Sequence, residues 1–182
     1  NMIYFILKTA GQAVSMISSV NAQIGARSYD TGFHVTTPDP WDIQKFLRKA
    51  VNAKSEYFVL EATSHGLDQN RLAFANFKIG VVANITHEHL DYHKTWPKYA
   101  AAKAKLFKGV DFSILNYDDK KSFEFLKNRA SGKILTYSQR NPADFNLKNF
   151  PIKLKIGGDY NLSNALAAAA VCSSAGSSKL LQ

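Results

Sequence analysis

The segment from residue 84 to residue 107 concentrates side chains that could do chemistry. It carries three histidines and two acids in seven positions, His87, Glu88, His89, Asp91 and His93. Imidazole and carboxylate groups are ordinary ligands of divalent metals. One histidine combined with carboxylates suits a hard ion such as Mg²⁺ better than zinc. The spacing alone also fits a surface loop, so it indicates a candidate metal site without settling one.

Lys103 follows this cluster on a predicted helix. Tyr99 and Phe107 lie four residues to either side of it and share its helix face. The ordinary interpretation is a lysine whose methylene stem packs on the apolar face while the ammonium group reaches water. An ammonium group beside Mg²⁺ would be repelled. A functional Lys103 therefore needs an anionic substrate beside it or a changed charge.

A second candidate ligand closes an apolar run. Glu61 follows four apolar residues in a predicted strand over 57–63. We expect this acid to be buried, and buried carboxylates are rare unless they are paired or bound to a metal. It could instead cap a nearby helix. An Mg²⁺ ligand is favoured because the histidine cluster follows the next predicted strand.

Two further sets of polar groups could bind a ligand. A predicted loop over 63–71 carries hydroxyl, amide and guanidinium groups at Thr63, Ser64, Gln69 and Arg71. Arg71 suits two-pronged contact with a carboxylate or phosphate. Asn161 and Asn164 either cap the helix that they begin or present amides to a ligand. No G-x-x-x-x-G-K-[ST] phosphate loop occurs in the chain.

The elements expected to position these residues are strands and helices that alternate along the chain. Short apolar runs predict strands at 13–19, 57–63, 77–86, 111–119 and 133–138, with an edge strand at 150–158. Helical patterns cover 2–10, 41–53, 95–107, 120–130 and 161–176. Such alternation predicts an α/β fold with a mainly parallel sheet flanked by helices. Ligands in such sheets bind beyond the carboxyl ends of the strands, where Glu61 and the cluster at 86–93 are expected.

Length, charge and composition indicate what kind of protein the chain is and what it could bind. The 182 residues fit one domain, and the net charge of +9 suggests an anionic partner. Scattered lysines on solvated faces explain most of that charge, a phosphate-bearing small molecule comes next, and nucleic acid is third. No apolar run reaches the ~18 residues of a membrane span. The lone Cys172 cannot form an internal disulfide, which fits a cytoplasmic location.

Five motifs follow one another in a distinctive order. They are TTPDP at 36–40, EATSHGLDQNR at 61–71, NITHEHLDYH at 84–93, YAAAKAKLF at 99–107 and GDYNLSNALAAAA at 158–170. In this set and order the chain resembles the Mur ligases, most of all the UDP-N-acetylmuramyl-tripeptide synthetase branch (MurE). The resemblance runs through nearly the whole chain. It implies that 1–182 is the P-loop-type central, ATPase domain, with the phosphate loop expected before Asn1 and the carboxy-terminal domain expected after Gln182.

The resemblance also implies a reaction. Mur ligases use ATP and Mg²⁺ to join a free amino acid to a UDP-N-acetylmuramyl peptide in peptidoglycan synthesis. The γ-phosphoryl group passes to the substrate carboxylate, and the incoming amine displaces phosphate from the acyl phosphate. We expect a cytoplasmic monomer with no nucleic-acid or membrane partner. Without the phosphate loop, residues 1–182 alone are expected not to use ATP.

Carried over position by position, the resemblance assigns roles to ten residues. It makes Glu61 and His89 Mg²⁺ ligands and Lys103 a carbamate-bearing lysine that holds a second Mg²⁺, and these three are the catalytic set. It places substrate contacts at Thr36, Thr37, Thr63, Gln69 and Arg71, and the adenine near Asn161 and Asn164. The chain departs from the usual motifs at three positions, with Thr63 for serine, Glu88 for aspartate and Lys94 for glycine.

Three alternatives remain open. A folylpolyglutamate synthase-like ligase belongs to the same class of enzyme, but the SHGLDQNR segment argues against it. A basic nucleic-acid-binding α/β module would need basic and aromatic residues clustered on one face, which the sequence does not suggest. An inactive fragment is the third. The residues do not name the amino acid that is added.

Overall fold

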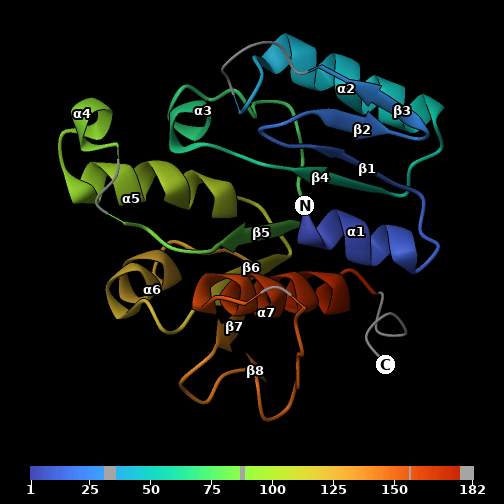
Figure 1. The fold of residues 1–182 in the computed structure, drawn as a ribbon. Helices are drawn as coiled ribbons and strands as arrows, with labels where there is room; N and C mark the ends of the chain where they lie inside the picture. The colour runs from blue at the N-terminus through green and yellow to red at the C-terminus, as the bar shows by residue number, and fades with distance from the viewer. Residues whose placement is uncertain (31–35, 87–88, 156, 177–182) are drawn as a thin grey trace. The chain divides into compact units, whose positions relative to one another are not determined.

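The computed structural model describes residues 1–30, 36–86, 89–155 and 157–176 (Figure 1). The chain divides into two compact units, Asn1–Ala75 and Asn76–Gln182. Each unit has its own four-stranded sheet in the described part of the chain. The predicted α/β fold with parallel strands flanked by helices is confirmed, although its strands fall into two sheets instead of one.

The first unit combines parallel and antiparallel strands. Its sheet has the order β3-β2-β1-β4, and β1 pairs parallel with β4 but antiparallel with β2. The strands are β1 (Val14–Ile17), β2 (Ala22–Ile24), β3 (Arg27–Tyr29) and β4 (Tyr57–Leu60). The helices are α1 (Met2–Thr9), α2 (Pro40–Asn52) and α3 (Ser64–Asp68). The β2–β3 hairpin was not predicted, because its strands have three residues each and turn at Gly25, which has a φ of +57°.

Helix α2 begins where the sequence predicts. The Asp39 side chain accepts a hydrogen bond from the Asp42 N–H (3.0 Å), and Pro40 occupies the first helical position. Ile43 is completely buried, whereas the Trp41 side chain is 71% exposed. The two residues are two positions apart, about 200° around the helix axis, so they lie on opposite sides of α2.

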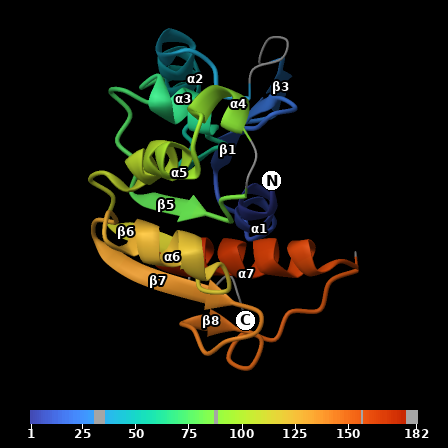
Figure 2. The same ribbon diagram turned by 90° about the vertical axis from the view of Figure 1, so that its left-hand side faces the viewer.

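The second unit has an all-parallel sheet in the order β5-β6-β7-β8. Its strands are β5 (Ile79–Val82), β6 (Phe112–Asn116), β7 (Lys133–Ser138) and β8 (Phe145–Asn146). Its helices are α4 (Leu90–His93), α5 (Trp96–Ala104), the 3₁₀ helix η1 (Lys105–Phe107), α6 (Lys120–Lys127) and α7 (Asp159–Ser174). Leu115 packs in a core cluster with residues of α5 and α6. Successive strand residues point to opposite faces, so the buried Ile114 faces the side that α7 covers (Figure 2).

The predicted edge strand at 150–158 is wrong for the described residues of that range. Among the described residues the last strand is β8, and local hydrogen bonds then turn the chain. The Asn149 side chain accepts a hydrogen bond from the Asn146 N–H (2.8 Å), and Asn146 O accepts one from the Phe150 N–H (2.7 Å). Pro151 has no N–H to offer a neighbouring strand. The alternating pattern therefore reflects partial burial of an irregular segment.

Within the described residues, no helix combines the length and apolar character needed to cross a membrane.

Phe74 combines two unfavourable features. Its φ is +67°, in the left-handed region, and its side chain is 92% exposed. A bulky residue is strained there by about 1–2 kcal/mol, whereas glycine is not. We expect Phe74→Gly to raise the free energy of unfolding by about 0.5–1 kcal/mol, after the entropic cost of glycine. Urea denaturation would measure it. Phe5→Ala, at an exposed phenylalanine in regular helix, is the control, and a loss of stability in Phe74→Gly would contradict the prediction.

Candidate active site

Two threonine hydroxyl groups meet in the first unit. Thr37 Oγ1 lies 3.1 Å from Thr63 Oγ1 and accepts a hydrogen bond from the Thr63 N–H (2.8 Å). Thr63 in turn caps α3 by accepting a hydrogen bond from the Gly66 N–H (3.1 Å). Residues 63–71 were predicted as a loop, but this cap starts a short helix within them. The fold therefore brings together Thr37 and Thr63, two predicted substrate-binding residues that lie 26 positions apart. Thr36, a third, directly precedes Thr37.

Arg71 joins the same cluster through its guanidinium group. Arg71 Nη1 donates to the backbone oxygen of Thr37 (2.7 Å), and Nε donates to Gln69 Oε1 (2.8 Å). Thr37 is completely buried, so this bond satisfies a carbonyl that has little access to water. Four of the five predicted substrate-binding residues thus form one hydrogen-bonded group, which we call the threonine–arginine cluster: Thr37, Thr63, Gln69 and Arg71.

Gly66 allows α3 to approach Thr37 closely. A Cβ atom at Gly66 would lie 2.7 Å from Thr37 Cγ2 and 2.8 Å from Thr37 Cβ. We expect Gly66→Ala to push Thr37 away and to destabilise the fold by about 1–3 kcal/mol, as overpacking does. Thermal unfolding would measure the loss. Gly157→Ala is the control because nothing lies within 4 Å of a Cβ there. Equal stability of the two variants would show that Thr37 moves freely.

Glu61 follows β4 at the carboxyl end of the first sheet, as predicted. Its Oε2 accepts a hydrogen bond from the Ser19 N–H (2.9 Å), which follows the neighbouring parallel strand β1. The expectation that this acid is buried is wrong, because Glu61 is exposed. The apolar run before it lies in the sheet, while the carboxylate lies past the last ladder bond. An exposed, positioned carboxylate can serve as a ligand without the cost of burial.

In the second unit, side chains hold Ala83, Asn84 and Ile85, the three residues that follow β5. Asn116 Nδ2 and the Tyr137 hydroxyl both donate to Ala83 O, at 2.9 and 3.1 Å. Lys103 Nζ donates to Asn84 O (3.1 Å) and Trp96 Nε1 donates to Ile85 O (3.2 Å). Burial is the main cause that raises the pKa of the Tyr137 hydroxyl well above its ordinary value, so it keeps its proton as a donor. This segment, 83–85, leads directly to the histidine cluster.

Tyr99 gathers the predicted catalytic groups of this unit. Its buried ring lies 5.9 Å from the His89 ring and is stacked on the His93 ring at 5.2 Å. Lys103 Nζ lies 5.0 Å from the centre of the same ring. The contact between Lys103 and Tyr99 agrees with the shared helix face that their spacing predicts. Lys103 is half-buried, and His89 is exposed. His87 and Glu88 lie outside the described residues.

Each unit presents a candidate metal ligand on its surface. No group of three or more histidine, cysteine or acidic side chains within the described ranges is arranged to hold a metal. In the first unit, Glu61 offers an exposed carboxylate, an oxygen ligand of the kind that Mg²⁺ prefers, and in the second unit His89 offers an exposed imidazole. Lys103 could act as a metal ligand in its own unit only if its ammonium group becomes an anion.

Asn161 and Asn164 lie in the first turns of α7. The helix begins at Asp159 after Gly158, so the predicted capping role of the asparagines is wrong. Asn161 Nδ2 instead donates to Gly157 O (2.9 Å), which ties the side chain to the preceding segment. Asn164 is exposed, one turn further along the same face. Of the two predicted roles for these asparagines, the one that remains is that they present their amide groups to a ligand.

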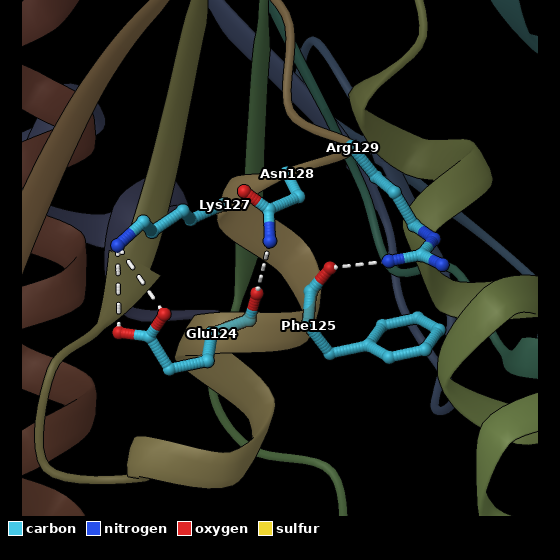
Figure 3. Close-up of polar contacts among 5 residues, drawn as sticks. All are labelled: Glu124, Phe125, Lys127, Asn128 and Arg129. Atoms are coloured by element: carbon cyan, nitrogen blue, oxygen red, sulfur yellow. Dashed lines mark hydrogen bonds and ion pairs between the residues drawn. The ribbon is translucent and has the colours of Figure 1, made fainter.

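The basic residues at the end of α6 make local contacts. Lys127 Nζ pairs with Glu124 Oε2 (3.2 Å), and Arg129 Nη1 donates to Phe125 O (2.9 Å), as Figure 3 shows. The Arg129 guanidinium group also lies 3.7 Å from the centre of the Phe125 ring. Asn128 Nδ2 donates to Glu124 O (3.1 Å). Arg129 thus satisfies a carbonyl oxygen near the end of the helix, where the helix dipole also favours positive charge.

Comparison with known proteins gives one family. Residues 1–172 match the family described as the Mur ligase middle domain. UDP-N-acetylmuramoyl-L-alanyl-D-glutamate--2,6-diaminopimelate ligase 1 of Clostridium acetobutylicum is 33% identical over 189 aligned residues, which cover 94% of this chain and 39% of that protein. The ligase of the same activity from Parabacteroides distasonis is 37% identical over 147 residues, covering 79% of this chain and 30% of that protein.

A solved structure is similar in fold. It is titled as a UDP-N-acetylmuramoyl-L-alanyl-D-glutamate--2,6-diaminopimelate ligase and superimposes with a TM-score of 0.86 at 28% identity. The match covers 99% of this chain and 42% of that chain. The chain therefore spans about two fifths of the length of the proteins that it resembles.

Proposed function

Because the chain belongs to the Mur ligase family and matches its middle domain, we propose that it is part of an ATP-dependent ligase adding an amino acid to a UDP-N-acetylmuramyl dipeptide. The observation that carries this proposal is the extent of the family match. Residues 1–172 include every candidate residue from Thr36 to Asn164. The reaction would belong to a longer protein that supplies the phosphate loop and the carboxy-terminal domain.

We assign the threonine–arginine cluster to the muramyl substrate. Hydroxyl and guanidinium groups are suited to carboxylate and phosphate oxygens. The internal bond from Arg71 to Thr37 O fixes the plane of the guanidinium group before substrate arrives. Such preorganisation lowers the entropic cost of binding. The amides of Asn161 and Asn164 are assigned to the adenine of ATP.

The acidic and imidazole groups are assigned to phosphoryl transfer. Glu61 and His89 are each proposed as an Mg²⁺ ligand, and Mg²⁺ offsets negative charge on the phosphoryl oxygens when it is bound. The Ser19 N–H orients the Glu61 carboxylate, and the Tyr99 ring contacts that of His89. Lys103 lies against the same ring and would add a further anion once carbamylated. We also propose a cytoplasmic monomer, where ATP and a nucleotide-linked substrate are available.

The amino acid is proposed to be 2,6-diaminopimelate, because the names of the relatives specify it. The test is phosphate release by the full-length protein with ATP, Mg²⁺, UDP-N-acetylmuramoyl-L-alanyl-D-glutamate and diaminopimelate. We expect release only when all are present, and a product whose mass equals dipeptide plus amino acid minus water. Lysine, which lacks one carboxylate, tests the choice of amino acid. Ligation of glutamate to a folate instead would overturn the proposal.

A further inference from the structure

Asp118 lies just beyond β6 and collects hydrogen bonds from the end of the neighbouring strand. Ser138 Oγ and Asn141 Nδ2 donate to its Oδ1, at 2.5 and 2.8 Å. The Gln139 N–H donates to Oδ2 (2.7 Å). Burial alone would raise the pKa of Asp118, but these bonds hold it below its usual value. The carboxylate therefore fixes the turn at 138–141 as an anion.

That turn is connected in the same way to the start of α7. Gln139 Nε2 donates to the backbone oxygen of Asp159, the first residue of the helix, at 2.6 Å. Arg140 Nη2 lies 3.8 Å from Asp159 Oδ2. Asn161 follows two residues later. The position of the predicted adenine contacts thus depends on the turn that Asp118 holds.

Asp118 is also connected to the segment that follows β5. The Asp118 N–H donates to Asn116 Oδ1 (2.9 Å), and Asn116 Nδ2 donates to Ala83 O (2.9 Å). The adjacent Asp119 caps α6 and accepts a hydrogen bond from the Ile85 N–H (3.3 Å). Residues 83–85 lead to His89 and hold Lys103 through Asn84 O.

We propose that Asp118 is a positioning residue that sets the start of α7 relative to the 83–85 segment. Through Asn116 it holds the 83–85 segment, which leads to His89 and bonds Lys103, and through Gln139 it holds the start of α7, which carries Asn161. The inference rests on the proposed function, since it takes these two segments to bind the phosphate end and the adenine end of one nucleotide. Aspartate is required because three donors converge on its two oxygens, and an asparagine would turn an NH₂ group toward one of them.

Asp118→Asn in the full-length protein tests the inference. We expect the KM for ATP to rise roughly tenfold, the effect of losing bonds to a charged group. The KM for the UDP-linked substrate should stay within about twofold, because the threonine–arginine cluster belongs to the other unit. Hydrogen exchange should also quicken at the amides of 139–141 and 161. Gln139→Ala, which removes only the bond to Asp159 O, should raise the KM for ATP in the same direction even if Asp118→Asn folds poorly.

Asp144→Asn is the matched control. Asp144 follows β7 as Asp118 follows β6, and it accepts two bonds from Thr136, from its N–H (2.8 Å) and its hydroxyl (2.7 Å). Both bonds are made within the strand region and neither reaches α7. We expect its KM for ATP to remain at the wild-type value. If the unsubstituted protein uses ATP but Asp118→Asn and Asp144→Asn behave alike, the inference alone fails. If the unsubstituted protein neither binds nor uses ATP, the proposed function fails and the inference with it.

Discussion

Lys103→Ala in the full-length protein is expected to lower kcat for ligation roughly 10²–10³-fold, the size of effect that follows loss of a group that stabilises transition-state charge. We expect Lys103 to add CO₂ through its neutral amine, forming Lys–NH–COO⁻ and releasing a proton. The alanine variant would lack that metal-holding anion. The free energy of unfolding should fall by only about 1 kcal/mol, because Lys103 is half-buried and its bond to Asn84 O is one to a backbone oxygen of an exposed residue.

The rescue of this variant distinguishes an anion from a cation. Small carboxylates should partly restore turnover of Lys103→Ala, and removal of CO₂ should reversibly inactivate the unsubstituted protein. Lys98→Ala, at an exposed lysine of the same helix, is the control and should keep full activity. If Lys103→Arg is nearly as active as the unsubstituted protein and bicarbonate has no effect, Lys103 acts as a plain ammonium group beside the substrate.

Arg71→Ala is expected to raise the KM for the UDP-linked substrate roughly 10–100-fold, because a hydrogen bond to a charged group is worth about 1.5–3 kcal/mol. The structure adds a second reason. The substitution removes the donor to the buried Thr37 carbonyl, at 2.7 Å, and the partner of Gln69. The threonine–arginine cluster should therefore loosen, and the free energy of unfolding should fall by about 1–3 kcal/mol.

Steady-state kinetics with each substrate varied in turn would measure this effect. The KM for ATP should change much less than that for the UDP-linked substrate. Arg129→Ala is the control, since Arg129 also donates to a backbone oxygen, that of Phe125, but lies outside the candidate site. An unchanged KM for the UDP-linked substrate in Arg71→Ala would contradict the assignment of Arg71 to that substrate.

Most regular elements were predictable because local patterns determine them. The run at 57–60 and the alanine-rich segment of α7 are long or apolar enough to be recognised without tertiary information. The β2–β3 hairpin was missed because three-residue strands carry too little periodicity. The segment at 150–158 was misassigned because its alternating burial resembles that of a strand, although its hydrogen bonds are local.

The candidate site was predictable in its residues and less so in its contacts. Motifs identify Thr37, Thr63 and Arg71, but only the fold shows that Arg71 binds Thr37 O across 34 positions. Glu61 was expected to be buried because its neighbours are apolar, and it is exposed because the sheet ends before it. Asp118 was missed altogether. Its hydrogen-bond partners lie at the end of a different strand, β7, about 20 residues further along the chain. One indication was present in the sequence, the pair of acids Asp118 and Asp119 at the end of a predicted strand.

The donors that hold residues 83–85 have a consequence for biosynthesis. Ala83 O accepts from Asn116 and from Tyr137, 33 and 54 positions further along the chain. During translation, the segment is therefore made before both of its partners. At about 5–20 residues per second, Tyr137 is made several seconds after Ala83. We expect nascent chains that stop before Tyr137 to keep this region accessible to protease, and longer ones to close it in one step.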